Sequence, residues 1–439
     1  MAFAWQDVTG QRHYDITDFM RRALQVISGF LLLAAPLLAQ DRRLWVLRAP
    51  GEMVEYDPST FAAKQTVKVP AEAVQAPRSV SVNRIGQILF APPVSLPLAD
   101  SDVDAPHKVW FWNGRAAATF DLGVKRENAT TGSNQAVTEL APEVHLATDG
   151  GHLFWFANQE RRLVREGVDL SITTAWQAWQ TDLNAAGRED LATAKLPDCR
   201  CPTGACEESC PYGVVWAPDG GVGTFFLMTQ FVAGKDEPAY TASARYQQDG
   251  GKWTASPLPQ PLRRVLDAAP GSDVIVEAIP DTACCGWSNQ TNDQTLVLVN
   301  GKTRAIFDEQ ATYKNQDYDV SFYASNARLS PQLAMVAMTM VATAQPNQPI
   351  QLAEEGQANP EESKQIHKAL AELPAVEVKS LDESSRRVAF LPHTTLVGWI
   401  SEKELLLVED HILVVYNLAT GARRKSSVRV EDSARVFLR

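Results

Sequence analysis

Short apolar runs separated by turn residues recur along most of this chain. In one unit, Val144–Ala147 runs into Asp149-Gly150-Gly151 and then into Leu153–Phe156. Runs of this length, bounded by Gly, Pro, Asn or Asp, are typical of β-strands joined by tight turns. Comparable strand–turn–strand units begin near residues 79, 143, 213, 265, 320 and 395. The pattern therefore predicts an all-β protein.

Each unit closes with a second hairpin, as at Trp110–Gly114, Leu298–Lys302 and Val414–Gly421. A repeat of four strands, at intervals of about 50 to 75 residues, is typical of a β-propeller whose blades carry insertions. One such blade cannot bury both of its faces, so several must stack against one another. We therefore expect a single β-propeller.

Both ends of the chain carry incomplete units. The segment 43–69 supplies three strands, and 434–439 supplies one more. Together they would make a seventh blade, and closure by strands from both termini would remove exposed sheet edges. The expected fold is one propeller of seven four-stranded blades with one helical insertion, and a count of six or eight blades stays open.

Some turns carry a family resemblance. The stretches Trp216–Gly220 and Leu329–Pro331 resemble the strand–SPDG–strand signature of TolB-like propellers, and Val54–Thr60 and Tyr416–Gly421 resemble outer-strand turns of WD40-like bacterial propeller repeats. The resemblance covers most of 43–439 but is weak in each copy, and Asn83–Gly86 and Ser401–Glu404 depart from it. It implies a fold, and a fold does not determine a function.

Long connections are expected at one end of the blades. In a four-stranded antiparallel blade, the second-to-third connection and the connection to the next blade emerge at the same end. Because loops on a rigid scaffold often carry function, this end is the expected working surface. The alternative is that the insertions only decorate the surface. The long segments are Pro92–Pro106, Leu122–Pro142, Asn184–Tyr212, Pro280–Thr295 and Ala342–Pro374.

The last of these segments, 342–374, contains a predicted helix. Asn359 is a suitable N-cap, Pro360 suits the first helical position, and the pattern ends near Leu373. An apolar stripe on this helix indicates packing on the propeller, with partner binding as the alternative. The stripe consists of Ile366, Ala369, Leu370 and Leu373.

The first 39 residues indicate an export signal. Met20-Arg21-Arg22 precedes a short apolar core, Phe30–Leu38, and Ala39 ends a stretch suited to cleavage. We expect translation to start at Met20, cleavage after Ala39, a mature domain over 40–439 and a periplasmic or secreted location. The alternative is an uncleaved N-terminal anchor. A stable membrane span after cleavage is not expected, because the apolar core is short.

Composition restricts the partners. The chain has 439 residues and a formal net charge of −11, with no long basic run to offset it. Nucleic acid is therefore a disfavoured partner. A protein or a cell-envelope polymer is the expected partner, and we expect a monomer.

All six cysteines fall in two insertions, as Cys199, Cys201, Cys206 and Cys210, and as Cys284 and Cys285. An even number in an exported chain favours disulfides, with Cys284 and Cys285 each pairing into 199–210. Thiolates at this spacing could instead bind Zn²⁺, and redox chemistry is a third reading. No other cofactor is predicted. Neighbouring candidates for a binding surface are Glu207, Glu208, Trp287 and Asn289.

No local catalytic motif accompanies these features: the sequence contains no H-E-x-x-H, no G-x-S-x-G and no phosphate-binding glycine loop. The leading hypothesis is an exported propeller that acts as a binding module through its loop-rich end. One alternative is a glycan hydrolase or lyase with carboxylates such as Asp267 and Asp319 at the channel mouth. The other alternative is a metal-binding protein that uses the cysteine cluster.

Overall fold

The computed structural model of this chain describes residues 5–6, 12–13, 42–92, 108–121, 127–131, 134–146, 152–165, 168–182, 187–190, 210–216, 224–232, 238–249, 252–262, 264–269, 274–278, 294–299, 302–308, 320, 322–347, 349–350 and 360–439. The chain divides into two compact units, Met1–Arg42 and Arg43–Arg439. In the first unit, β1 (Trp5–Gln6) pairs antiparallel with β2 (Arg12–His13). The expected apolar core and cleavage point lie outside the described residues, so export stays a prediction.

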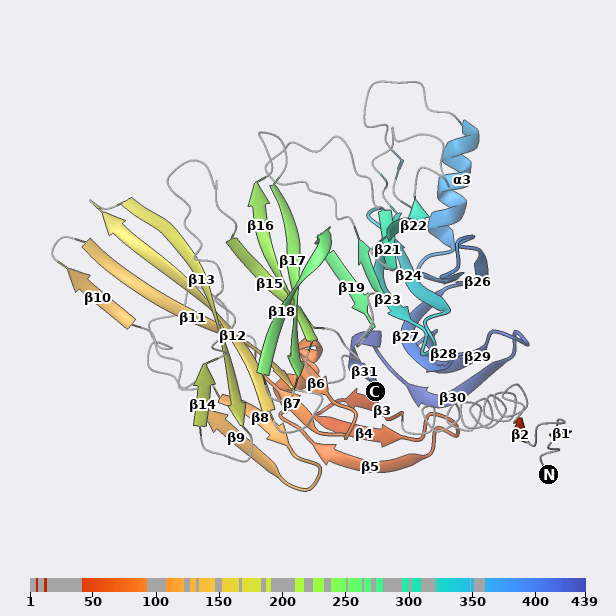
Figure 1. Ribbon diagram of the computed structural model, residues 1–439, viewed down its shortest axis with the longest axis horizontal. Coiled ribbons are helices and arrows are strands. Elements are labelled where there is room, and N and C mark those ends of the chain that lie inside the picture. The colour runs from red at the N-terminus through yellow and green to blue at the C-terminus, as the bar shows by residue number, and fades with distance from the viewer. Residues whose placement is uncertain are drawn as a thin grey trace. The chain divides into compact units, whose positions relative to one another are not determined.

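The second unit is built from small antiparallel sheets, seven of them within its described residues (Figure 1). One sheet joins strands from both ends of the unit, in the order β31 (Val436–Leu438), β3 (Leu44–Arg48), β4 (Glu52–Tyr56) and β5 (Ala63–Lys68). The 3-10 helices η1 (Ala71–Val74) and η2 (Pro77–Ser79) lead to the next sheet. The terminal strand pairing expected from the sequence is therefore present.

The following sheets are mostly four-stranded and keep chain order. They are β6 (Val80–Val82), β7 (Ile88–Phe90), β8 (Lys108–Trp112) and β9 (Ala117–Asp121), and then, after the sheet of 127–190, β15 (Cys210–Trp216), β16 (Thr224–Val232), β17 (Pro238–Asp249) and β18 (Lys252–Leu262). Three prolines lie in β18, which is an edge strand and so can lose ladder hydrogen bonds on its outer side.

The C-terminal half continues this arrangement. The strands are β19 (Arg264–Ala268), β20 (Ile275–Ala278), β21 (Gln294–Val299) and β22 (Lys302–Asp308); β23 (Phe322–Leu329), β24 (Met335–Ala342), β25 (Ala375–Ser380) and β26 (Arg387–Pro392); and β27 (Thr394–Ser401), β28 (Glu404–Glu409), β29 (Ile412–Asn417) and β30 (Arg423–Arg429). A 3-10 helix, η4 (Ser433–Arg435), precedes β31.

One sheet departs from the four-strand prediction. It has five strands, β10 (Glu127–Thr131), β11 (Asn134–Leu146), β12 (His152–Arg165), β13 (Val168–Asp182) and β14 (Gly187–Asp190). The expectation of a long loop over Leu122–Pro142 was therefore wrong, as was part of that over Asn184–Tyr212. Thr131 pairs with Asn134 in an antiparallel ladder, so β10 extends the sheet beside β11.

The core lies between consecutive sheets because the central strands are apolar on both sides. Along β3, Trp45 and Leu47 pack toward β6–β8, whereas Leu44 and Val46 pack toward β27–β29. Alternate side chains of a strand point to opposite faces, so one strand contributes to two interfaces. The same alternation on β24 places Met338 and Ala337 in different clusters.

The helix α3 (Pro360–Ala371) begins where the sequence predicts it. Ile366 and Leu370 are buried in the cluster shared by β20–β24, and Ala369 and Leu373 pack against that cluster. The apolar stripe is thus used within the chain, and the hypothesis that it binds a partner was wrong. No described helix is long and apolar enough to cross a membrane.

Candidate functional site

The residues predicted to form a site lie mostly beyond what the structure describes. Cys199, Cys201, Cys206, Cys284 and Cys285 fall outside it, as do Glu207, Glu208, Trp287, Asn289 and Asp319. Cys210 is the first residue of β15, where its backbone pairs with Gln230. Disulfide pairing, Zn²⁺ binding and the surface around these residues therefore stay predictions. Within the described residues, no group of three or more His, Cys, Asp and Glu side chains has metal-site geometry.

Asp267 is the one of the two suggested catalytic carboxylates that the structure describes, and it makes a structural contact between two sheets. It is buried on β19, and its Oδ2 accepts a hydrogen bond of 2.7 Å from the backbone N–H of Leu329 on β23. A buried carboxylate bound to a backbone amide ties two neighbouring sheets together. This contact explains why an acid follows Val265 and Leu266 in an apolar inner strand.

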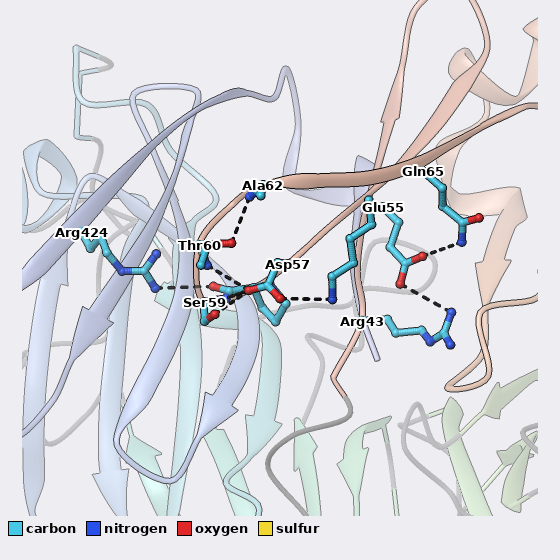
Figure 2. A network of polar contacts seen from close by, with 10 residues as sticks. Arg43, Glu55, Asp57, Ser59, Thr60, Ala62, Gln65 and Arg424 are labelled. Atoms are coloured by element: carbon cyan, nitrogen blue, oxygen red, sulfur yellow. Dashed lines mark hydrogen bonds and ion pairs between the residues drawn. The ribbon is translucent and has the colours of Figure 1, made fainter.

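The main described polar network begins on β4, where Glu55 lies buried between apolar neighbours (Figure 2). Gln65 lies opposite Glu55 on β5, and its Nε2 donates to Glu55 Oε2 at 2.6 Å. The Arg43 guanidinium lies 3.5 Å from Glu55 Oε1. The charge of Glu55 is thus matched by one cation and one amide, as a buried carboxylate requires.

A tight turn follows directly in the same network. Asp57 Oδ1 accepts hydrogen bonds from the backbone N–H groups of Ser59 (2.9 Å) and Thr60 (3.0 Å), and from the Ser59 hydroxyl. Lys64 Nζ lies 3.2 Å from Asp57 Oδ2. The Ser59 hydroxyl is the main cause that holds the pKa of the Asp57 carboxyl well below its usual range, and Lys64 acts in the same direction. Asp57 therefore remains an anion that organises the turn.

The same turn occurs between β29 and β30. Asn417 Oδ1 accepts from the N–H groups of Ala419 and Thr420, both at 3.0 Å. In both copies the fifth residue donates its N–H to the first carbonyl and has a positive φ, 58° at Phe61 and 71° at Gly421. The resemblance between Val54–Thr60 and Tyr416–Gly421 thus reflects one shared backbone motif, in which Asp or Asn supplies the acceptor.

The turn at Leu329-Ser330-Pro331 shows what a serine does at this position. Ser330 Oγ accepts from the N–H groups of Ala334 (3.1 Å) and Met335 (3.0 Å), so it closes the turn internally. The Ser330 hydroxyl donates to Glu402 Oε1 at 2.7 Å, and Glu402 Oε2 accepts from Gln332 N–H at 2.9 Å. Glu402 belongs to the turn of the next sheet. We call this set of contacts the Ser330–Glu402 clasp.

Further polar contacts join the same two sheets. The indole Nε1 of Trp399 donates to the carbonyl of Arg328 at 2.8 Å, and Leu396 N–H donates to Thr339 Oγ1 at 3.0 Å. A separate set of contacts lies within the β23–β26 sheet, where buried Glu377 accepts from Arg387 Nε at 2.7 Å and Lys379 lies 3.7 Å from the same carboxylate. The Trp399 and Thr339 contacts thus hold neighbouring sheets in register, whereas the Glu377 contacts join strands of one sheet.

Sequence reasoning missed Glu55, Glu377 and Glu402. For the first two the signal was available, because each is an acid within an otherwise apolar central strand, in MVEY and AVEV. Such a residue must find a cation or a donor nearby. The partner of Glu402 is 72 positions away in the chain, so it follows only from the packing of sheets.

Most of the described sheets of the second unit are four-stranded, antiparallel and in chain order. No protein-family model matches the sequence, and no curated protein matches it. Among solved structures with β-propeller-type folds, it is similar to Porphyromonas gingivalis dipeptidyl peptidase 4 at 8% identity and a TM-score of 0.41, covering 90% of this chain and 59% of that one. The chain thus spans about three fifths of that peptidase.

Two further structures are similar at lower TM-scores. They are dihydro-heme d1 dehydrogenase NirN in complex with DHE (10% identity, TM-score 0.30, 88% of this chain and 73% of that one) and Saccharomyces cerevisiae Sqt1 (10% identity, TM-score 0.28, 77% and 81%).

Proposed function

We propose that this chain is an exported seven-bladed β-propeller that binds a protein or a cell-envelope polymer through the loop-rich end of its blades. Antiparallel sheets that follow one another in chain order support this architecture, as does the pairing of β31 with β3. In the proposed ring each sheet is one blade, and β31 closes it as the inner strand of the blade completed by β3, β4 and β5. The resemblance of individual turns to TolB-like repeats agrees with this assignment.

Unequal connections at the two ends of the sheets carry the functional proposal. First-to-second and third-to-fourth strand turns are short, as at 83–87, 113–116 and 330–334. At the opposite end lie the segments between β7 and β8, β14 and β15, β20 and β21, and β24 and β25. Long loops gathered at one end of a rigid scaffold commonly form a binding surface.

Four acids with contacts in the scaffold favour binding over catalysis at their own positions. Glu55 and Glu377 bind cations and donors within their own sheets, whereas Asp267 and Glu402 bind donors of a neighbouring sheet. An acid engaged in this way holds the scaffold together and is poorly placed to take a proton from a substrate. As the sequence predicts, the proposed protein is a monomer in the periplasm or outside the cell.

Site-specific photo-crosslinking tests the binding end. A photoreactive residue replaces Trp287 in the 279–293 insertion or, as the matched control, exposed Arg115 in the short turn at 113–116. We expect crosslinks to one envelope component from position 287 and none from 115. Crosslinks of equal yield from both positions, or from neither, would contradict the proposal.

Export and the cysteines are tested by the intact mass of protein purified from an export-competent host. We expect a start at Gln40, no free thiols and three disulfides among the six cysteines. A retained N-terminus would contradict export. If free thiols and bound Zn²⁺ were found, the disulfide prediction would be wrong, and the 199–210 loop would be assigned as a metal site.

A further inference from the structure

The outer strand β30 has an unusual concentration of positive charge. Arg423, Arg424 and Lys425 are consecutive and exposed, and Arg429 follows in the same strand. The whole chain has a net charge of −11, so this strand departs sharply from the average. Among the described ion pairs, Glu409 pairs with both Arg423 (2.6 Å) and Lys425 (3.1 Å), so one carboxylate serves two cations.

Arg424 points to the other side of the strand from Arg423 and Lys425. Its guanidinium carbon lies 4.9 Å from the centre of the Phe61 ring. Its Nη2 donates to the carbonyl of Pro58 at 3.5 Å, and Figure 2 shows the Arg424 side chain beside the turn of Ser59 and Thr60. Neither of these two partners is an anion, so neither compensates the positive charge of Arg424. Cations therefore flank the strand on both of its faces, next to the turn that holds Ser59 and Thr60.

Within the described strands, the backbone of β30 is paired on one side. The sheet order is β27-β28-β29-β30, and no described strand pairs with the outer side of β30 (Figure 1). An edge strand presents alternating N–H and C=O groups that another strand can bind.

Protection against aggregation does not account for the pattern. Charged residues on an edge commonly block unwanted pairing. Another exposed edge strand of this chain, β9, reads Ala-Ala-Thr-Phe-Asp and has no cation. In the edge strand β5, Lys64 is paired with its own carboxylate, Asp57. The described last strands β5 and β22 carry two cations each, whereas β30 carries four, three of them consecutive.

We propose that β30 binds an extended acidic peptide segment, which adds as a fifth strand and places its carboxylates against Arg423, Arg424 and Lys425. Main-chain hydrogen bonds supply the pairing, and the two rows of cations select alternating acidic side chains. This surface is distinct from the loop-rich end, so it does not depend on the binding function proposed above.

Peptide binding measured by fluorescence anisotropy tests this inference on the full chain. The probe is a labelled acidic strand-forming peptide, Ac-(Glu-Glu-Val)3-NH2, which places acids on both faces of a strand, and the control peptide is Ac-(Glu-Glu-Pro)3-NH2. Proline cannot donate ladder hydrogen bonds but leaves the charge unchanged. We expect the Val peptide to bind more than about tenfold tighter than the Pro peptide, and to weaken as salt rises. Equal binding of both peptides would reduce the effect to electrostatics and overturn the inference.

Variants then locate the site. R423E/R424E/K425E should weaken binding of the Val peptide by more than about tenfold, since three attractive contacts become repulsive. The matched control is K364E/K368E on the exposed side of α3, and it should leave binding unchanged. R424A alone, which keeps the Glu409 ion pairs, provides a milder variant should the triple change unfold the sheet, and it should weaken binding about threefold. Equal affinity of R424A and the unaltered chain would refute the site.

Discussion

Removal of the Ser330–Glu402 clasp should lower the free energy of unfolding, because the clasp joins the β23–β26 sheet to the β27–β30 sheet. The size of this loss can be worked out from its hydrogen bonds. Glu402 accepts two hydrogen bonds, from the Ser330 hydroxyl and from Gln332 N–H. A hydrogen bond to a charged group contributes about 1.5–3 kcal/mol, and Glu402 is only half-buried, so the lower figure applies. E402A should therefore lower the free energy of unfolding by about 2–3 kcal/mol. E402Q, which keeps one acceptor oxygen, should lower it by about 1 kcal/mol.

The assay is urea unfolding, monitored in parallel by tryptophan fluorescence and by far-UV circular dichroism. Coincident transitions are needed before a two-state free energy is used for a chain of this size. The matched control is E383A, since Glu383 is exposed and makes none of the side-chain contacts described. E383A should lie within about 0.5 kcal/mol of the unaltered chain.

A double-mutant cycle with S330A separates the clasp from general effects. Ser330 Oγ also accepts two N–H groups of its own turn, so S330A alone should be costly as well. The shared hydrogen bond should appear as a coupling energy of about 1 kcal/mol between positions 330 and 402. A loss below about 0.5 kcal/mol in E402A, or a coupling near zero, would refute the reasoning.

Three further predictions concern single positions. G421A should destabilise the chain by about 1 kcal/mol in the same urea assay, because its φ of 71° disfavours a side chain although only Tyr416 Oη lies within 4 Å of the added carbon; an unchanged midpoint would show that the turn relaxes. For Asp57, whose pKa is lowered in the fold, stabilisation is complete above the unfolded value of about 3.9 and is lost as the pH falls through the folded value. D57N should therefore lose less stability than the unaltered chain between pH 5 and 3, and equal losses would exclude Asp57 as a cause. I366A should cost about 2–5 kcal/mol by leaving a cavity between α3 and its sheet, whereas exposed His367 replaced by Ala should be nearly neutral; equal effects of these two changes would show that the stripe does not pack as described.

Strand positions followed from the sequence because turn residues bound short apolar runs. Units expected near 265 and 395 begin at Arg264 and Thr394, and the helix expected from Asn359 begins at Pro360. These signals are local: a turn needs Gly, Asp or Asn within a few positions, and a helix start needs its cap. Local signals survive in the fold wherever packing agrees with them.

The five-stranded sheet and the polar contacts between sheets did not follow from the sequence. In residues 127–142, Glu, Asn, Thr, Ser and Gln occupy nine of the 16 positions, and this composition does not separate a solvated edge hairpin from a loop. Contacts between sheets depend on side chains far apart in the chain, such as Asn326, whose Nδ2 donates to the carbonyl of Leu396 at 3.3 Å. Neither periodicity nor spacing specifies these partners.

The terminal strand shows how such interfaces become coupled. In β31, Phe437 faces Trp45 and packs toward β6–β8, whereas Val436 and Leu438 face Val46 and Leu44 and pack toward β27–β29. One three-residue strand therefore contributes apolar surface to the interfaces on both sides of its sheet. Repeat folds owe their stability to each unit and to its contacts with adjacent units. Loss of β31 would weaken two interfaces at once and leave the backbone edge of β3 unpaired. This explains why the sheet that joins both ends of the chain has apolar side chains on both faces of its central strand.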